Sequence, residues 1–178
     1  MFKPIVSGLL AALLLISGAA IANAFHSEDE DAQDEAHDYP EARSYTVSDD
    51  ASGDVDAALV RAAENEKRVL LVMGANWCHD SRALAGWLGT ERFKALIDEQ
   101  YELVFVNVGT PQSEGDGHNL HIARRFGLEE LPGTPNVLVV TSQGALLNAE
   151  TATTWRNAAS RDEDVIYEEL EALAKRAK

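Results

Sequence analysis

Cysteine is almost absent from this chain, which has one, Cys78, among 178 residues. A single cysteine permits no internal disulfide and cannot supply a four-cysteine metal site. Basic residues are also scarce, because 15 Lys and Arg face 30 Asp and Glu and give a formal net charge of -15. Such a charge repels phosphate backbones and argues against nucleic acid as a partner. Cys78 therefore has either a chemical role or a packing role.

The length and the apolar content limit the architecture. A chain of 178 residues accommodates one domain with appendages, and 46% hydrophobic residues are enough to fill a core. Wholesale disorder is excluded on this composition. We therefore expect one folded domain.

Residues 1–24 are typical of a secretory signal peptide. Lys3 carries the only charge there, residues 5–21 are uncharged, and Ala22 and Ala24 are the small residues expected before a cleavage site. An uncleaved membrane anchor is the alternative, since the uncharged stretch approaches the roughly 20 residues that span a bilayer. The small residues favour cleavage after Ala24. We therefore expect a periplasmic or secreted protein that has no membrane contact after cleavage, in an oxidising compartment where other proteins carry disulfides.

The next segment, residues 25–50, is strongly acidic. It holds ten Asp and Glu against Arg43 alone and has few large apolar residues. Such a composition buries too little surface to offset the entropy of ordering the chain. The sequence therefore predicts a disordered leader at 25–50 and a folded domain at 51–178.

Hydrophobic periodicity after residue 50 alternates between the two element types. Apolar residues at helical spacing predict helices over 55–63, 81–88, 91–99, 119–126 and 166–177, and short apolar runs predict strands at 69–73, 103–108, 137–140 and 145–147. Ser52 and Asp54 are expected to cap the first helix, and Ser160 with Glu163 to form a capping box at the last one. This order predicts an α/β fold with a central mixed sheet, mainly parallel with an antiparallel hairpin at its C-terminal end, covered by helices on both faces.

The segment Trp77-Cys78-His79-Asp80-Ser81 lies between the end of a predicted buried strand and the start of a helix. Helix-initial N-H groups and the helix dipole stabilise an anion there, and can lower the pKa of a thiol from about 8.5 to roughly 3.5–7.5. Ser81 returns to the same side of the first turn, where its hydroxyl could bond the sulfur. A cationic His79 would support the thiolate and Asp80 would oppose it. The alternative is that Cys78 is simply a small buried hydrophobic residue.

A second feature is the segment Leu131-Pro132-Gly133-Thr134-Pro135-Asn136, which immediately precedes the third predicted buried strand. Proline is tolerated at a strand entrance. The Thr134-Pro135 bond is a candidate cis peptide, with an ordinary trans turn as the alternative.

Taken together, these two segments resemble the thioredoxin superfamily, in its secreted or periplasmic branch. Residues 77–81 look like its Trp-Cys-x-x-Cys active site and Thr134-Pro135 like its cis-proline loop, and the similarity covers nearly all of residues 54–178. The resemblance implies a catalytic Cys78 flanked by His79 and Ser81, with Trp77, Thr134 and Pro135 in contact with the substrate. No cofactor and no metal are implied.

Two departures from the family pattern point to a monothiol member with a Cys-x-x-Ser site. Ser81 stands where the second cysteine is expected, so a disulfide cycle cannot close within the chain. Val72 stands where many members carry a buried acid. The resemblance then implies a thiol-disulfide oxidoreductase or isomerase that forms a mixed disulfide at Cys78. Its partner would be a client protein that bears a disulfide or a thiol, and release would depend on the client's own thiol or a small external thiol.

Two other functions remain open from the residues alone. A noncatalytic binding module or chaperone would hold a protein through the surface around Trp77 and Pro135, with Cys78 incidental. Alternatively, Cys78 and His79 could capture a metal together with His118 and His121. We expect thiol chemistry rather than either of these.

Overall fold

The computed structural model describes residues 39–109 and 119–176. Three strands form its sheet, in the order β2-β1-β3: β1 (Arg68–Gly74), β2 (Tyr101–Asn107) and β3 (Asn136–Val140). β1 runs parallel to β2, with Leu70 opposite Leu103, and antiparallel to β3, with Leu71 opposite Leu138. Every residue of β1 is buried, because an apolar strand in the centre of a sheet is covered on both faces.

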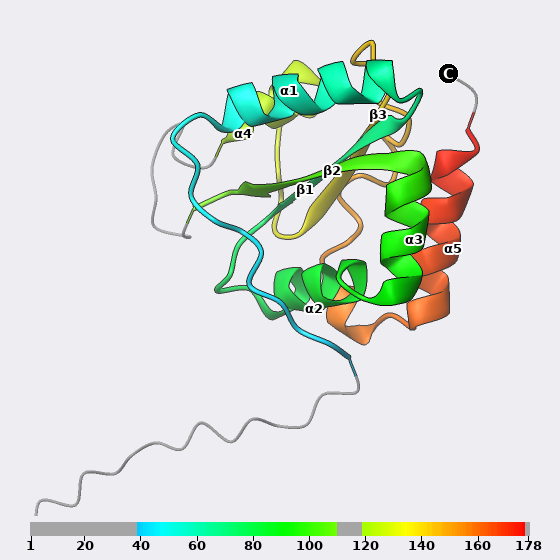
Figure 1. The fold of residues 1–178 in the computed structure, drawn as a ribbon. Helices are drawn as coiled ribbons and strands as arrows, with labels where there is room; N and C mark the ends of the chain where they lie inside the picture. Colours follow the sequence, from blue (N-terminus) through cyan, green and yellow to red (C-terminus); the bar gives the residue numbers. More distant parts are fainter. Residues whose placement is uncertain (1–38, 110–118, 177–178) are drawn as a thin grey trace, which may run out of the picture. The chain divides into compact units, whose positions relative to one another are not determined.

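Helices cover both faces of this sheet (Figure 1). α2 (His79–Leu88), α3 (Glu91–Gln100) and α5 (Glu163–Ala174) pack on one face, and α1 (Ala51–Glu64) and α4 (Leu120–Arg125) on the other. Alternate residues of β1 enter different cores: Leu70 and Val72 join the α2, α3 and α5 side, whereas Leu71 joins the α1 and α4 side. Alternation of side chains along a strand therefore divides the interior into two clusters.

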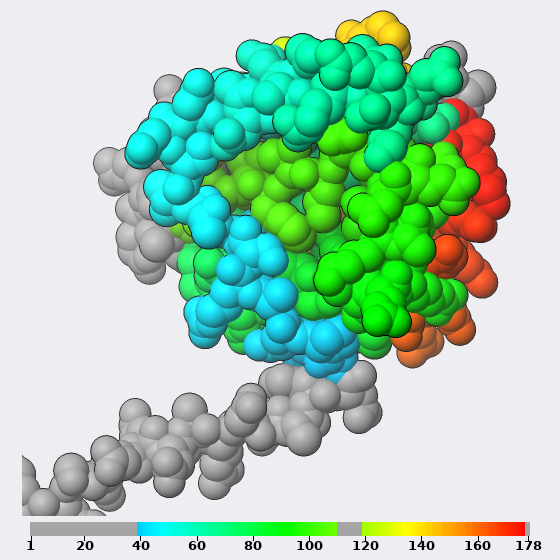
Figure 2. Space-filling model, in the orientation of Figure 1, coloured from blue at the N-terminus to red at the C-terminus, as the bar shows by residue number. Residues whose placement is uncertain are grey.

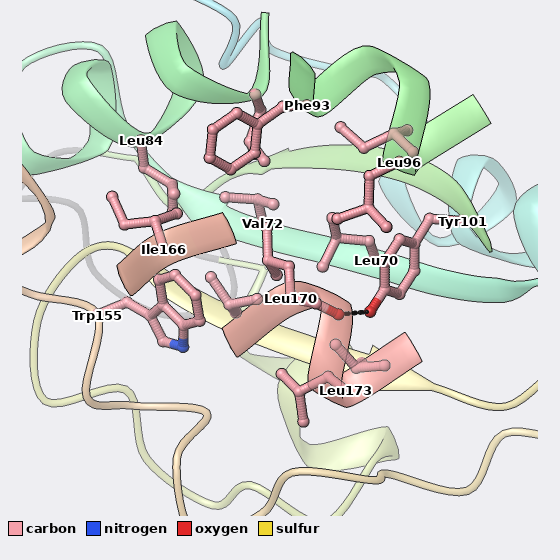
Figure 3. Packing of buried hydrophobic residues seen from close by; sticks show 14 of the residues in the cluster. Leu70, Val72, Leu84, Phe93, Leu96, Tyr101, Trp155, Ile166, Leu170 and Leu173 are labelled. Atoms are coloured by element: carbon pink, nitrogen blue, oxygen red, sulfur yellow. Dashed lines mark hydrogen bonds between the residues drawn. The ribbon is translucent and has the colours of Figure 1, made fainter. Parts of the chain in front are cut away.

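The larger cluster surrounds Leu70 and Val72 (Figure 3). Phe93 of α3 and Leu170 of α5 pack there, and the hydroxyl of Tyr101 donates a 2.6 Å hydrogen bond to the Leu170 carbonyl. That bond satisfies the polar end of a buried aromatic ring. The start of β2 is thereby joined to α5.

The expected α/β fold, with a mixed sheet and helices on both faces, is confirmed. The pairing differs in detail, because the described sheet has one parallel and one antiparallel pair, and the strand predicted at 145–147 is reduced to a single bridge between Val140 and Leu146. The side chain of Asn148 supplies the reason: its Oδ1 accepts from the Val139 amide and its Nδ2 donates to the Val137 carbonyl. One amide group thus satisfies backbone positions of β3 that a full strand would otherwise pair.

Both predicted helix caps are wrong. Asp50 caps α1, with its Oδ1 accepting from the Gly53 amide at 2.8 Å, because the helix begins earlier than Ser52 and Asp54 suggested. α5 begins after Asp162, and no box forms with Ser160 because its hydroxyl donates to Asn157 while Glu163 accepts from Arg92.

The boundary of the folded domain also needs correction. Residues 39–50, here called the N-terminal strap, pack on the domain although they lie within the predicted disordered leader 25–50. Tyr45 is only 1% exposed, and the strap lies beside α2 and β2 (Figure 2, blue and cyan spheres). The other leader residues, 25–38, and the predicted signal peptide 1–24 lie outside the described residues. Within the described ranges, no helix has the length and apolar character to cross a membrane.

Candidate active site

Cys78 occupies the N-cap position of α2, four residues after β1 ends. Its backbone is extended, with φ −90° and ψ 123°, and its side chain makes no capping hydrogen bond to the helix. The half-buried Sγ instead lies 3.5 Å from the carbonyl oxygen of Thr134. The sulfur therefore lies between a helix start and the loop before β3, in a residue that is partly exposed.

That loop contains the peptide bond expected to be cis, and Thr134-Pro135 is cis in the structure. Asn136, the first residue of β3, is fully buried, and its Nδ2 donates a 2.6 Å hydrogen bond to the Gly133 carbonyl. Asn136 also pairs with Met73 of β1. Asn136 thus connects β1, through backbone pairing, to the loop that faces the sulfur, through its side chain.

Ser81 lies in the first turn of α2 but does not bond the sulfur. Its side chain is fully buried, and its Oγ has no hydrogen-bond partner among the described residues. The expected contact between Ser81 and Cys78 is therefore wrong, because Sγ lies beside Thr134 while Oγ lies against Gly74, where an added Cβ would come within 2.8 Å of it. The residue at the position of the family's second cysteine therefore carries a buried hydroxyl without a hydrogen-bond partner among the described residues.

His79 and Asp80 interact with each other rather than with the sulfur. His79 Nε2 is 3.2 Å from Asp80 Oδ2, and the histidine side chain is 64% exposed. The other oxygen of Asp80 accepts a 2.9 Å hydrogen bond from the Ala159 amide in the short 3-10 helix η2 (Ala158–Ser160). Asp80 thus joins α2 to the segment before α5, and its two carboxylate oxygens contact a backbone amide and an imidazole.

Trp77 precedes the cysteine and is 50% exposed. Its indole Nε1 donates a 2.6 Å hydrogen bond to the Gly109 carbonyl, just after β2. This bond holds the ring over the surface near the thiol. A large, half-exposed aromatic side chain beside a free thiol can offer an apolar contact to a bound partner.

Contacts between the strap and the loop that carries Cys78 were not predicted from the sequence. Asn76 holds Tyr45 through two hydrogen bonds, from the Tyr45 amide to Oδ1 and from Nδ2 to the Tyr45 carbonyl. The Tyr45 hydroxyl donates to the Ser81 carbonyl, and burial raises the pKa of Tyr45 far above its usual value. Asn107 Nδ2 also donates to the Tyr45 carbonyl. One tyrosine in an acidic segment has no periodic pattern around it, so the sequence alone carried no signal for this contact.

Arg82 completes the support. It forms a two-point ion pair with Glu41 of the strap and donates to the Asn76 carbonyl at 3.2 Å. Hydrogen bonding to Glu41, and then the charges of Glu41 and Cys78, raise the pKa of Arg82 despite partial burial. Arg43 donates to the same carbonyl at 3.4 Å. Two guanidinium groups therefore converge on the residue two positions before the thiol.

The alternative metal set is not brought together by the described residues. His121 Nε2 is 3.0 Å from Ser52 Oγ of α1, and His118 lies outside the described residues. Across residues 39–109 and 119–176, no three His, Cys, Asp or Glu side chains gather as a metal would require.

Comparison with known proteins shows similarity to a protein family and to a solved structure. A family described as thioredoxin-like matches residues 50–142. A crystal structure titled as the disulphide isomerase from Xylella fastidiosa Temecula1 is similar over 75% of this chain and 100% of its own, with 30% identity and a TM-score of 0.65. No protein of the curated set matches the sequence.

Proposed function

The chain belongs to the thioredoxin-like family, and on that premise we propose that it is a thiol-disulfide oxidoreductase or isomerase of the monothiol type. Its substrates are disulfides of client proteins, and Cys78 is the nucleophile. The similar protein from Xylella fastidiosa is titled a disulphide isomerase, which supports this class of reaction. We further propose that the protein acts in the periplasm or outside the cell, after cleavage behind Ala24.

The reaction has two exchange steps. The Cys78 thiolate attacks one sulfur of the client disulfide, so that a bond to Sγ forms, the client S–S bond breaks, and the leaving sulfur takes up a proton. Another thiol, from the client or from a small external thiol, then attacks the mixed disulfide and releases Cys78. If the attacking thiol is a different cysteine of the client, the client disulfide is rearranged, and no net electron transfer takes place. If an external thiol reductant supplies two thiols, the client disulfide is reduced and the reductant is oxidised.

The observation that carries the proposal is the position of Sγ, half-buried at a helix start and 3.5 Å from the Thr134 carbonyl. A thiol at this position can attack a disulfide that a client brings to the loop before β3. An extended client segment that pairs with the backbone at Thr134 would place its own sulfur beside Sγ. Trp77 would cover one side of that segment.

Ser81 explains why release needs a second molecule or a client thiol. A hydroxyl cannot displace Cys78 from a mixed disulfide, and Oγ is buried and unpaired at this position. Val72, in the centre of β1, is fully buried among apolar side chains and offers no proton acceptor. Both features favour a mixed disulfide that persists until a thiol reaches it.

Trapping of the mixed disulfide tests the proposal. A client protein with an exposed disulfide is incubated with the chain under mildly oxidising conditions, and adducts are resolved without reductant and identified by mass spectrometry. We expect adducts with the native chain and with the matched variant Ser81→Ala, none with Cys78→Ala, and loss of all adducts in dithiothreitol. No adduct with the native chain, together with alkylation of Cys78 by iodoacetamide no faster than that of a free thiol at pH 7, would refute the proposal.

A noncatalytic binding module is the second candidate, and the half-exposed Trp77 favours it. In that case partner binding would survive Cys78→Ser and fall in Trp77→Ala. The same client and the two variants separate the alternatives, because catalysis requires the sulfur and binding requires the ring.

A further inference from the structure

The side chain of Arg156 lies across the loop that faces the thiol. A Cβ added at Gly133 would be 2.6 Å from Arg156 Cδ and 3.7 Å from its Nη1, so both the stem and the guanidinium rest on this glycine. Gly133 immediately precedes Thr134, whose carbonyl oxygen is 3.5 Å from Cys78 Sγ. A cation thus sits beside the backbone on which a client segment is expected to lie.

Arg156 is exposed and has no ion pair or hydrogen bond within the part of the chain that the structure describes. The other arginines all bind a carboxylate or a backbone carbonyl, and they are Arg43, Arg61, Arg68, Arg82, Arg92, Arg124, Arg125, Arg161 and Arg176. A free guanidinium is unexpected in a chain with 30 acidic residues. Its five donors are available to a ligand.

We propose that Arg156 is a specificity-determining residue that binds a carboxylate of the client segment next to the cysteine that Cys78 attacks. This inference rests on the proposed thiol-disulfide exchange and names its preferred substrates: disulfides flanked by Asp or Glu. The guanidinium fork matches a carboxylate with two parallel hydrogen bonds, which an ammonium group cannot do.

The short distance over which Arg156 can bind a carboxylate limits the position of the acidic residue in the client segment. An extended segment advances about 3.3 Å per residue, so an acidic side chain within roughly three residues of the attacked cysteine can meet Arg156. Among the acids of the neighbouring loop, Glu129 lies 4.0 Å from Arg124, and Glu130 is exposed. Arg156 therefore acts by direct hydrogen bonds at short range, and not through a broadly positive surface.

Single-turnover kinetics with three peptides test the inference. Each peptide carries one cysteine joined as a disulfide to neutral 2-thiopyridine. The three peptides differ at one position near this cysteine, which is Glu in the first, Gln in the second and Lys in the third. Cys78 attacks the peptide sulfur, the peptide-to-Cys78 disulfide forms, and pyridine-2-thione leaves and is followed by its absorbance. The variants are Arg156→Gln, Arg156→Lys and the control Lys94→Gln, which removes an exposed cation on α3.

We expect the native chain to react about threefold faster with the Glu peptide than with the Gln peptide, as for one exposed ion pair, and more slowly with the Lys peptide. Arg156→Gln abolishes the difference between Glu and Gln, whereas Lys94→Gln preserves it. Arg156→Lys retains part of it. The preference shrinks as salt is raised, because the contact is exposed.

The outcomes separate the two proposals. If the native chain fails to react with the Gln peptide, or reacts as slowly as Cys78→Ala, the proposed exchange itself is wrong. If it reacts but shows no preference for Glu, or if the preference survives Arg156→Gln, the role of Arg156 is refuted. An equal fall for all three peptides in Arg156→Gln also refutes it, since that result would mean that Arg156 only supports the loop at Gly133. Urea unfolding of each variant verifies that the fold is intact.

Discussion

Tyr45 joins the N-terminal strap to the loop and helix start at Cys78, and its replacement tests whether the strap belongs to the folded domain. Tyr45→Phe removes only the hydroxyl that donates to the buried Ser81 carbonyl at 3.1 Å, which we expect to lower the free energy of unfolding by about 1 kcal/mol. Tyr45→Ala removes a ring that is 1% exposed and packs edge-on against Phe105. By analogy with other buried aromatics, this should cost about 3–5 kcal/mol and lower the melting temperature by about 10 °C.

Equilibrium unfolding in urea at pH 7, followed by tryptophan fluorescence, measures these changes. Val47→Ala is the matched control, because Val47 lies in the same strap with 85% of its surface exposed and its truncation should change stability by less than about 0.5 kcal/mol. If Tyr45→Ala behaves like Val47→Ala, the strap does not pack as described. The rate at which iodoacetamide alkylates Cys78 in the same variants then shows whether removing the Tyr45 side chain, which lies next to Asn76, also changes the reactivity of the thiol.

Three further predictions follow from other contacts. Burial raises the pKa of Tyr45, so its phenol ionises more readily in the unfolded chain, and the free energy of unfolding should fall as pH rises above about 10; the fall should be shallower in Tyr45→Phe, as pH-dependent urea midpoints would reveal. An added Cβ at Gly86 would lie 2.0 Å from the Pro40 carbonyl oxygen, so Gly86→Ala should cost about 1–3 kcal/mol in the same urea assay, and a neutral result would contradict this close approach of the strap to α2. Ser81→Ala should remove a buried hydroxyl that has no partner among the described residues, so the free energy of unfolding should stay the same or rise; a fall of more than about 1 kcal/mol in the urea assay would contradict this description of the hydroxyl.

The fold was largely predictable because its signals are local. Apolar runs gave β1 and β2, and the break at Gly89-Thr90 correctly separated α2 from α3. The strap was missed because acidic composition outweighs one tyrosine, and the burial of Tyr45 depends on Asn76 and Asn107, which are distant in sequence.

The candidate site was predictable in position but less so in its contacts. The proximity of the Cys78 loop to Thr134 agrees with what the family resemblance implies. The wrong expectation for Ser81 arose because helical spacing puts two residues on one side of a turn without fixing where each side chain points. Arg156 had no motif around it, and only folding placed it on Gly133.

The central position of β1 has a consequence for how the protein opens. Its backbone is hydrogen-bonded to a strand on each side, and all of its residues are buried. Its amides should therefore exchange with deuterium only through global unfolding, whereas the outer edge of β2 should exchange through smaller fluctuations. Cys78 follows the end of β1 by four residues, so the proposed nucleophile is attached to a strand that we expect to open only with the whole domain.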